Sequence, residues 1–169
     1  MEINYWAATY LAHATLRRWL RPTTASSKAG DNQAAPALPR HFIITSSTTC
    51  FVGVAGYAPY SPPKAALRSL ADTLRSELNL YNGYLRGHPG QGPAAEVKIH
   101  CVVPGTITSP GLDHENSLKH PVTAALEDGD PAQTEDEVAA AAVKGLESGG
   151  YLITTQFLGH AMRAGTLGG

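Results

Sequence analysis

Three short apolar runs, separated by segments of helical periodicity, constrain the fold of this chain more than any other feature. The runs are 41–45, 97–103 and 151–155, and each contains two or more Val, Ile or Thr residues. Short β-branched runs are typical of strands that are covered on both faces. Strands that alternate with helices are joined by right-handed crossovers into a parallel sheet. The sequence therefore predicts an α/β fold with about three parallel strands and flanking helices.

Helical periodicity is evident in three segments. Apolar residues recur at three- and four-residue steps over 3–20 and over 65–81, which predicts an amphipathic helix in each. Thr134 and Glu137 match the capping-box pattern and predict a third helix that continues through Leu146.

The segments between these elements are rich in turn-forming residues. The glycines and prolines of 82–96 predict that the second helix ends before them, and 21–40 is expected to be a loop or inserted linker. The segment 106–133 lacks sustained periodicity and is expected to be a long loop that covers a substrate. Three leucines of this segment are expected to be able to contact a lipid chain, namely Leu112, Leu118 and Leu126. We expect one domain over 1–155, with insertions near 22–39 and 83–95, and a C-terminal tail over 156–169.

Composition excludes several classes of protein. The 13 Lys and Arg residues against 14 Asp and Glu residues give a net charge of -1, which argues against a nucleic-acid partner. A hydrophobic share of 43% argues against a disordered chain. Cys50 and Cys101 lie in apolar stretches, which fits a reducing compartment better than a disulfide framework. The histidines and cysteines lack the spacing of metal ligands, so no metal site is expected.

The sequence gives no reason to expect a membrane span or a targeting peptide. A spanning helix needs about 20 consecutive apolar residues, and the chain has no such run, which leaves peripheral membrane contact. Glu2 comes early and Arg17 and Arg18 come late, the reverse of the order in a secretory signal.

Tyr60 and Lys64 are the first residues that point to catalysis. They are four residues apart at the start of the second predicted helix, and this spacing puts both side chains on one face about 5 to 6 Å apart. An ammonium at that distance stabilises a phenolate by about 3 kcal/mol, which makes the tyrosine a usable acid and base. In isolation, the same pattern more often reflects a capped helix and a solvated lysine.

Two neighbouring features favour the catalytic interpretation. Ser46 and Ser47 directly follow the first apolar run, and Pro104–Gly105 follows the second. Ligands of open α/β sheets bind at the carboxyl ends of strands. Together with Tyr60 and Lys64, these residues resemble the short-chain dehydrogenases/reductases, whose tetrad is Asn, Ser, Tyr and Lys, with the serine usually thirteen residues before the tyrosine.

The resemblance implies a role for each member of this tetrad. Ser47 meets the spacing and Ser46 is its neighbour, and only one of them should face the substrate because side chains alternate along a strand. Tyr60 would protonate the carbonyl oxygen to which the serine donates a hydrogen bond. Lys64 would lower the pKa of Tyr60 and bind the nicotinamide ribose. Asn4 matches the place of the family's asparagine, which helps to hold a water-linked proton path.

The resemblance also implies cofactor contacts after the second strand. Pro104 and Gly105 would line the cofactor site, with the backbone near Ile107 at the carboxamide and Ser109 at a phosphate. An ordinary strand-ending turn is the alternative interpretation of Pro104–Gly105.

Longer motifs narrow the family. They are ITSST at 44–48, YSP at 60–62, KAALRSL at 64–70, PGT at 104–106 and DPAQT at 130–134. With them the chain resembles the 3-ketodihydrosphingosine reductases. This resemblance implies reduction of a long-chain keto amino alcohol with NADPH in sphingolipid synthesis, at the cytosolic face of the endoplasmic reticulum. It is also compatible with a homodimer.

Two departures from the family pattern leave alternatives open. The glycine-rich turn that binds the pyrophosphate of a dinucleotide is absent, so the chain resembles only the C-terminal half of a doubly wound, Rossmann-like sheet. Pro62 and Pro63 would loosen the register between Tyr60 and Lys64. The chain could therefore be a non-catalytic remnant, or a reductase of another lipid or steroid ketone. We expect the strand over 41–45 to expose an unpaired edge and to reduce solubility.

Overall fold

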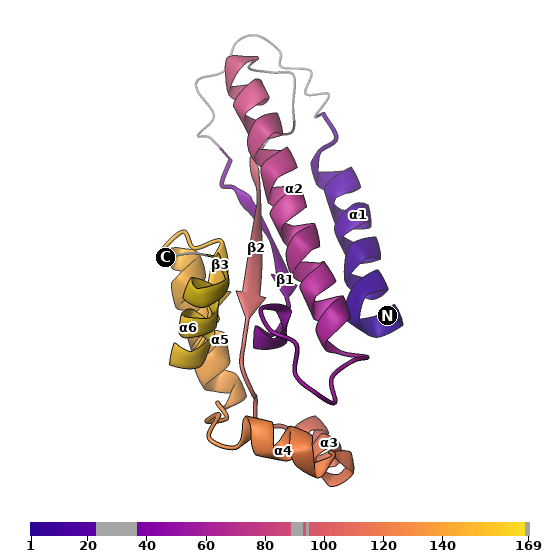
Figure 1. Cartoon of the computed structure of the whole chain (residues 1–169). Helices are drawn as coiled ribbons and strands as arrows, with labels where there is room; N and C mark the ends of the chain where they lie inside the picture. Colours follow the sequence, from indigo (N-terminus) through magenta and orange to yellow (C-terminus); the bar gives the residue numbers. More distant parts are fainter. Residues whose placement is uncertain (23–36, 89–92, 94, 168–169) are drawn as a thin grey trace.

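The structure, a computed structural model, describes residues 1–22, 37–88, 93 and 95–167. Its sheet contains three parallel strands in the order β1 (Arg40–Thr45), β2 (Val97–Val103) and β3 (Leu152–Thr154). Phe42 pairs with Ile99, and Cys101 pairs with Leu152. The predicted α/β fold with a parallel sheet is therefore confirmed, and Figure 1 shows β2 as its central strand.

Helices α1 and α2 cover one face of the sheet. A π-helical turn, η1 (Glu2–Trp6), leads into α1 (Ala7–Trp19), and α2 spans Ser61–Gly87. Apolar side chains of α2 pack with β2 in one buried cluster, to which Trp19 and Phe42 add an edge-to-face contact of 6.4 Å between ring centroids. Burial of this amphipathic face is the main source of stability for a helix in water.

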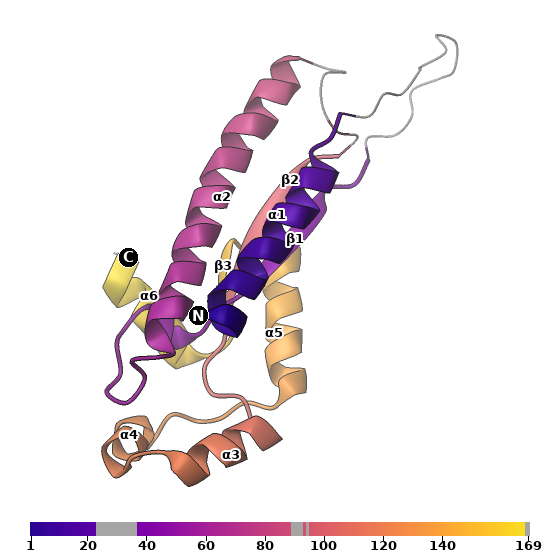
Figure 2. The same cartoon turned by 90° about the vertical axis from the view of Figure 1, so that its right-hand side faces the viewer.

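Helix α5 (Glu135–Glu147) covers the opposite face, as Figure 2 shows, and α6 (Phe157–Leu167) packs against β3. A Cβ atom on Gly145 would lie only 2.4 Å from Ile153 Cγ2, so glycine lets α5 approach β3 closely. The predicted capping box is confirmed, because the Glu137 amide donates to Thr134 Oγ1 and the Thr134 amide donates to Glu137 Oε2. Helix α6 occupies the segment for which the sequence predicts only a tail.

The prediction of a continuous loop over 106–133 is wrong. The segment forms α3 (Pro110–Leu118) and α4 (Pro121–Glu127), which lie beyond the carboxyl end of β2 in Figure 1. Each helix begins with proline, whose missing amide costs nothing in a first turn. Ser109 and His120 cap the two helices through side-chain acceptors.

The predicted end of the second helix is also wrong, because α2 continues through Gly83 to Gly87. Asn82 is buried there and its Nδ2 atom donates to the Val97 carbonyl over 3.0 Å, which ties the last turns to β2. The predicted insertion near 83–95 therefore begins in helix, and most of the insertion near 22–39 lies outside the described residues. Within the described ranges, no helix has the length and apolar content to cross a membrane.

Candidate active site

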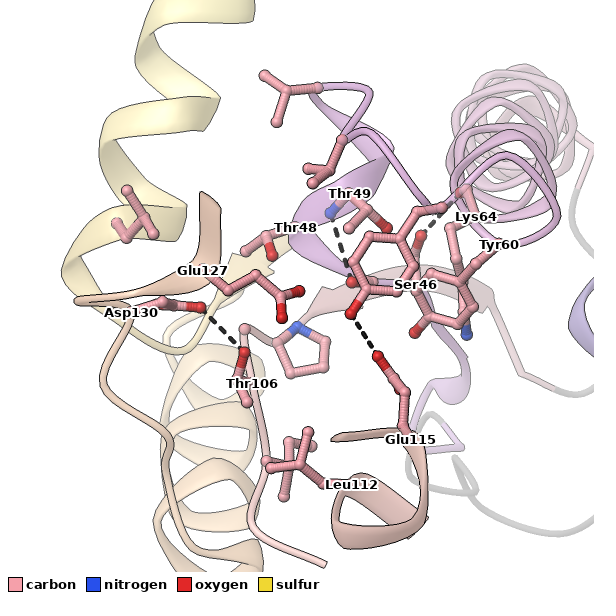
Figure 3. Close-up of a pocket in the computed structure, with 18 of the residues that line it drawn as sticks. Ser46, Thr48, Thr49, Tyr60, Lys64, Thr106, Leu112, Glu115, Glu127 and Asp130 are labelled. Atoms are coloured by element: carbon pink, nitrogen blue, oxygen red, sulfur yellow. Dashed lines mark hydrogen bonds between the residues drawn. The ribbon is translucent and has the colours of Figure 1, made fainter. Parts of the chain in front are cut away.

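A cleft of about 570 Å³ opens at the carboxyl ends of β1 and β2. The start of α2 forms one side of the cleft, and the 106–133 segment and α6 form the other sides. Parallel sheets bind ligands at this edge because the strands deliver polar loop residues there. Seven of the polar residues that line the cleft are Ser46, Ser47, Tyr60, Lys64, Glu115, Glu127 and Asp130. Figure 3 labels all of these except Ser47.

Tyr60 and Lys64 lie together on the α2 side of the cleft. Tyr60 immediately precedes α2, its carbonyl accepts from the Lys64 amide over 3.3 Å, and Lys64 Nζ lies 5.3 Å from the centre of the tyrosine ring. Pro62 and Pro63 occupy the first turn, where amides have no helical partner to lose. The two prolines therefore do not separate the pair.

The pKa of Tyr60 differs from the expectation. Burial raises it above the ordinary value, a hydrogen bond with Ser47 lowers it, and the charge of Glu115 raises it. Burial also lowers the pKa of Lys64. The net direction for Tyr60 is opposite to the expected lowering by Lys64, because desolvation penalises the phenolate. The phenol is thus protonated at neutral pH and can donate a proton.

The two adjacent serines have different partners. Ser46 is buried and its hydroxyl donates to the Lys64 carbonyl over 2.8 Å, so it fastens the end of β1 to the first turn of α2. Ser47 lies beside Tyr60, where its hydroxyl lowers the pKa of the phenol, and its side chain accepts from the Thr49 amide over 3.4 Å. Strand alternation allowed only one serine to face the substrate, and the structure places Ser47 beside the tyrosine.

Asn4 is not brought into the cleft. It is half-buried in η1, which packs against α2, and it does not line the cavity. Its role in a proton path therefore stays a prediction.

The four predicted cofactor residues after β2, which are Pro104, Gly105, Ile107 and Ser109, all line the cleft. A Cβ atom on Gly105 would lie 1.9 Å from Gln156 Nε2, so glycine makes room for that amide. Ile107 forms an isolated parallel bridge with Gln133. The Ser109 hydroxyl already accepts from the Leu112 amide over 3.2 Å, and its contact with a phosphate stays a prediction.

Sequence reasoning missed a group of charged residues on the 106–133 segment. Lys119 pairs with both Glu115 and Glu127, and the Tyr57 hydroxyl donates a hydrogen bond to Glu115. Asp130 accepts from the Thr106 hydroxyl over 3.0 Å and from Gln156 over 2.9 Å. Glu115 and Lys119 are four residues apart, a signal that has meaning only if a helix is predicted there.

The site fits part of a nicotinamide dinucleotide. Among the described residues Lys64 has no ion-pair partner, so its ammonium can donate to ribose hydroxyls beside the backbone of 104–107. The β1–α2 connection contains Gly53 and Gly56, but Gly56 packs against Thr123 and the pair does not form a pyrophosphate turn. Over the same residues, no three His, Cys, Asp or Glu side chains are arranged to hold a metal ion.

Comparison with solved structures identifies the class of fold. A short-chain dehydrogenase from Streptomyces avermitilis matches with a TM-score of 0.60 and 17% identity, over 98% of this chain and 54% of that one. A short-chain dehydrogenase from Burkholderia cenocepacia, solved with NADP, matches with a TM-score of 0.52 and 19% identity, over 76% and 43%. The chain therefore has the fold of the short-chain dehydrogenases. No protein-family model matches it.

Sequence relatives identify a particular group within that class. The 3-ketodihydrosphingosine reductase ksrA of Aspergillus fumigatus is 50% identical over 99% of this chain and 44% of its own length. The 3-ketodihydrosphingosine reductase of Neurospora crassa is 40% identical over 100% of this chain and 42% of its own length. The chain is thus a homologue of the 3-ketodihydrosphingosine reductases and spans less than half the length of these curated relatives.

Proposed function

We propose that this chain carries the proton-donating part of a reductase site, which reduces 3-ketodihydrosphingosine with NADPH in sphingolipid synthesis. One observation carries the proposal: a protonated Tyr60 hydroxyl lines a cleft at the carboxyl edge of the sheet together with Ser47 and Lys64. The names of the relatives support the choice of substrate. We also propose that the reaction takes place at the cytosolic face of the endoplasmic reticulum.

The chain's own residues supply the proton and hold the substrate. Bound NADPH supplies the hydride that reduces the carbonyl carbon. The hydroxyls of Tyr60 and Ser47 hold the carbonyl oxygen, and Tyr60 transfers its proton to that oxygen. Lys64 lies in the same cleft and opposes the negative charge left on the phenol oxygen.

The walls of the cleft suit an alkyl chain. The apolar side chains that line it include Val52, Val54, Ile107, Leu112, Leu126, Leu158 and Met162. Leu112 and Leu126 were predicted to touch a lipid, whereas Leu118 does not line the cleft and is 74% exposed. Burial of methylene groups against such a wall favours binding by about 0.8 kcal/mol each.

The decisive experiment combines cofactor binding with turnover. The chain is titrated with NADPH by fluorescence, and oxidation of NADPH is then followed with 3-ketodihydrosphingosine and, for comparison, with a steroid ketone. We expect saturable binding and turnover of the sphingoid ketone, and a loss of at least about 100-fold in Tyr60→Phe at unchanged NADPH affinity. Faster turnover of the steroid ketone would contradict the substrate proposed.

A second candidate, a non-catalytic remnant, is favoured by one observation. The described residues supply no glycine-rich turn between a strand and a helix for the pyrophosphate. A folded circular dichroism spectrum without NADPH binding would support the remnant and overturn the reductase for this chain.

A further inference from the structure

Two carboxylates share one ammonium on the wall of the cleft. Lys119 Nζ lies 3.3 Å from Glu115 and also pairs with Glu127, and the lysine side chain is only 7% exposed. We name Glu115, Lys119 and Glu127 the acidic triad. Two negative charges and one positive charge leave it with a net charge of -1, and both carboxylates line the cleft.

The acidic triad lies close to the proton donor. The Tyr57 hydroxyl donates a hydrogen bond to Glu115, and the ring centroids of Tyr57 and Tyr60 are 5.7 Å apart. The charge of Glu115 is felt at the Tyr60 hydroxyl, whose pKa it raises. Figure 3 shows Glu115 reaching from the 106–133 segment toward the residues at the start of α2. A substrate oxygen held at Tyr60 would therefore share the cleft with this carboxylate, on the side where Tyr57 links the two.

The other carboxylate of the cleft has different partners. Asp130 accepts from the hydroxyl of Thr106, which follows β2, and from the side-chain amide of Gln156, which follows β3. It fixes the base of the 106–133 segment. Glu115, and not Asp130, is among the groups whose charge shifts the pKa of Tyr60, so the negative charge that acts on Tyr60 belongs to the acidic triad.

We propose that the acidic triad binds the protonated amino group that the substrate carries on the carbon next to its ketone. This inference rests on the proposed function, because it assigns a second contact within the same site. In an α-amino ketone the ammonium and the carbonyl oxygen are borne by adjacent carbons, so a single pose brings the oxygen to Tyr60 and the ammonium to Glu115. The contact would neutralise the triad, whereas a ketone without the amine would leave its charge uncompensated.

The test measures selectivity for the amine directly. The full 169-residue chain is titrated at neutral pH with a short-chain analogue of dihydrosphingosine and with its N-acetyl derivative, and affinities are measured by calorimetry. We expect the free amine to bind roughly tenfold tighter, which is the usual effect of one charge-assisted hydrogen bond. Glu115→Gln and Glu127→Gln should each remove this preference, because either change makes the triad neutral. The exposed Glu147 lies outside the cleft, and Glu147→Gln should keep it.

Each outcome of the titration decides a separate point. Equal affinity of the wild-type chain for the amine and its N-acetyl derivative would overturn the assignment of the triad, while turnover of the sphingoid ketone would leave the proposed function standing. A preference that survives in both carboxamide variants would also overturn it. Binding of neither compound, together with an absence of turnover, would overturn the proposed function and the inference with it. Folding of each variant is checked by circular dichroism.

Discussion

Ser46 and Ser47 show how neighbouring residues of one type take different tasks. The Ser46 hydroxyl holds the first turn of α2, whereas the Ser47 hydroxyl meets the phenol of Tyr60. We expect Ser46→Ala to lower the free energy of unfolding by about 1 kcal/mol, since a buried hydrogen bond is lost. We expect Ser47→Ala to reduce turnover with a smaller loss of stability. Urea denaturation and steady-state assays separate the two effects, and the reverse pattern would contradict the division of tasks.

The charge of Glu115 gives the reaction a predictable dependence on pH. Burial and then this charge hold the pKa of Tyr60 above its ordinary 10.0, although the bond with Ser47 opposes them. Proton donation should therefore persist until the pH rises past 10.0 and the phenol ionises. Removing a negative charge stabilises the phenolate, so Glu115→Gln should move the alkaline limb of kcat/KM to lower pH. An unchanged limb in that variant would show that the two groups do not interact.

At the scale of the element, α2 and the β1–α2 connection contain glycines with opposite requirements. Gly83 lies inside α2 with open space around a Cβ atom, so Gly83→Ala should stabilise the chain by up to about 1 kcal/mol. Gly56 has a φ of +93°, and a Cβ atom there would lie 2.1 Å from Thr123 Oγ1. Gly56→Ala should destabilise it by about 1 kcal/mol or more. Chemical denaturation measures the free energy of unfolding of both variants. A change of the same sign in both would contradict the prediction.

Elements with local signals could be predicted from the sequence. The bounds of the strand over 97–103 follow from its apolar run, and Thr134 with Glu137 marks the start of α5 through hydrogen bonds made within one turn. The extension of α2 could not be predicted, because the bond from Asn82 to the Val97 carbonyl joins residues far apart in the chain. Such tertiary contacts override the local preference of a glycine.

Part of the candidate site could likewise be predicted from the sequence, and part could not. Tyr60, Lys64 and the two serines stand in a spacing that can be recognised without coordinates. The acidic triad cannot, because Pro110 and Pro121 suggest a loop where they in fact begin helices. Without α3 and α4, nothing in the sequence brings Glu115 near Tyr60.

At the scale of the whole molecule, β1 is the exposed edge of the sheet. Within the described residues it pairs only with β2, and Ile43 is 45% exposed beside an apolar groove between the sheet and α5. Unpaired strand edges with apolar side chains promote association between chains. We expect the chain to self-associate and Ile43→Lys to increase the monomeric fraction in light scattering. A monodisperse wild-type monomer would contradict this expectation.

The 106–133 segment is closed at its base by backbone hydrogen bonds. The Gln133 amide donates to the Thr106 carbonyl, and the Gln133 carbonyl accepts from the Thr108 amide. A protease that cuts the chain between α3 and α4 would therefore create two new chain ends there. The two ends of the 106–133 segment would stay joined by these hydrogen bonds. Damage there would remain local, and the severed pieces would migrate together until a denaturant parted them.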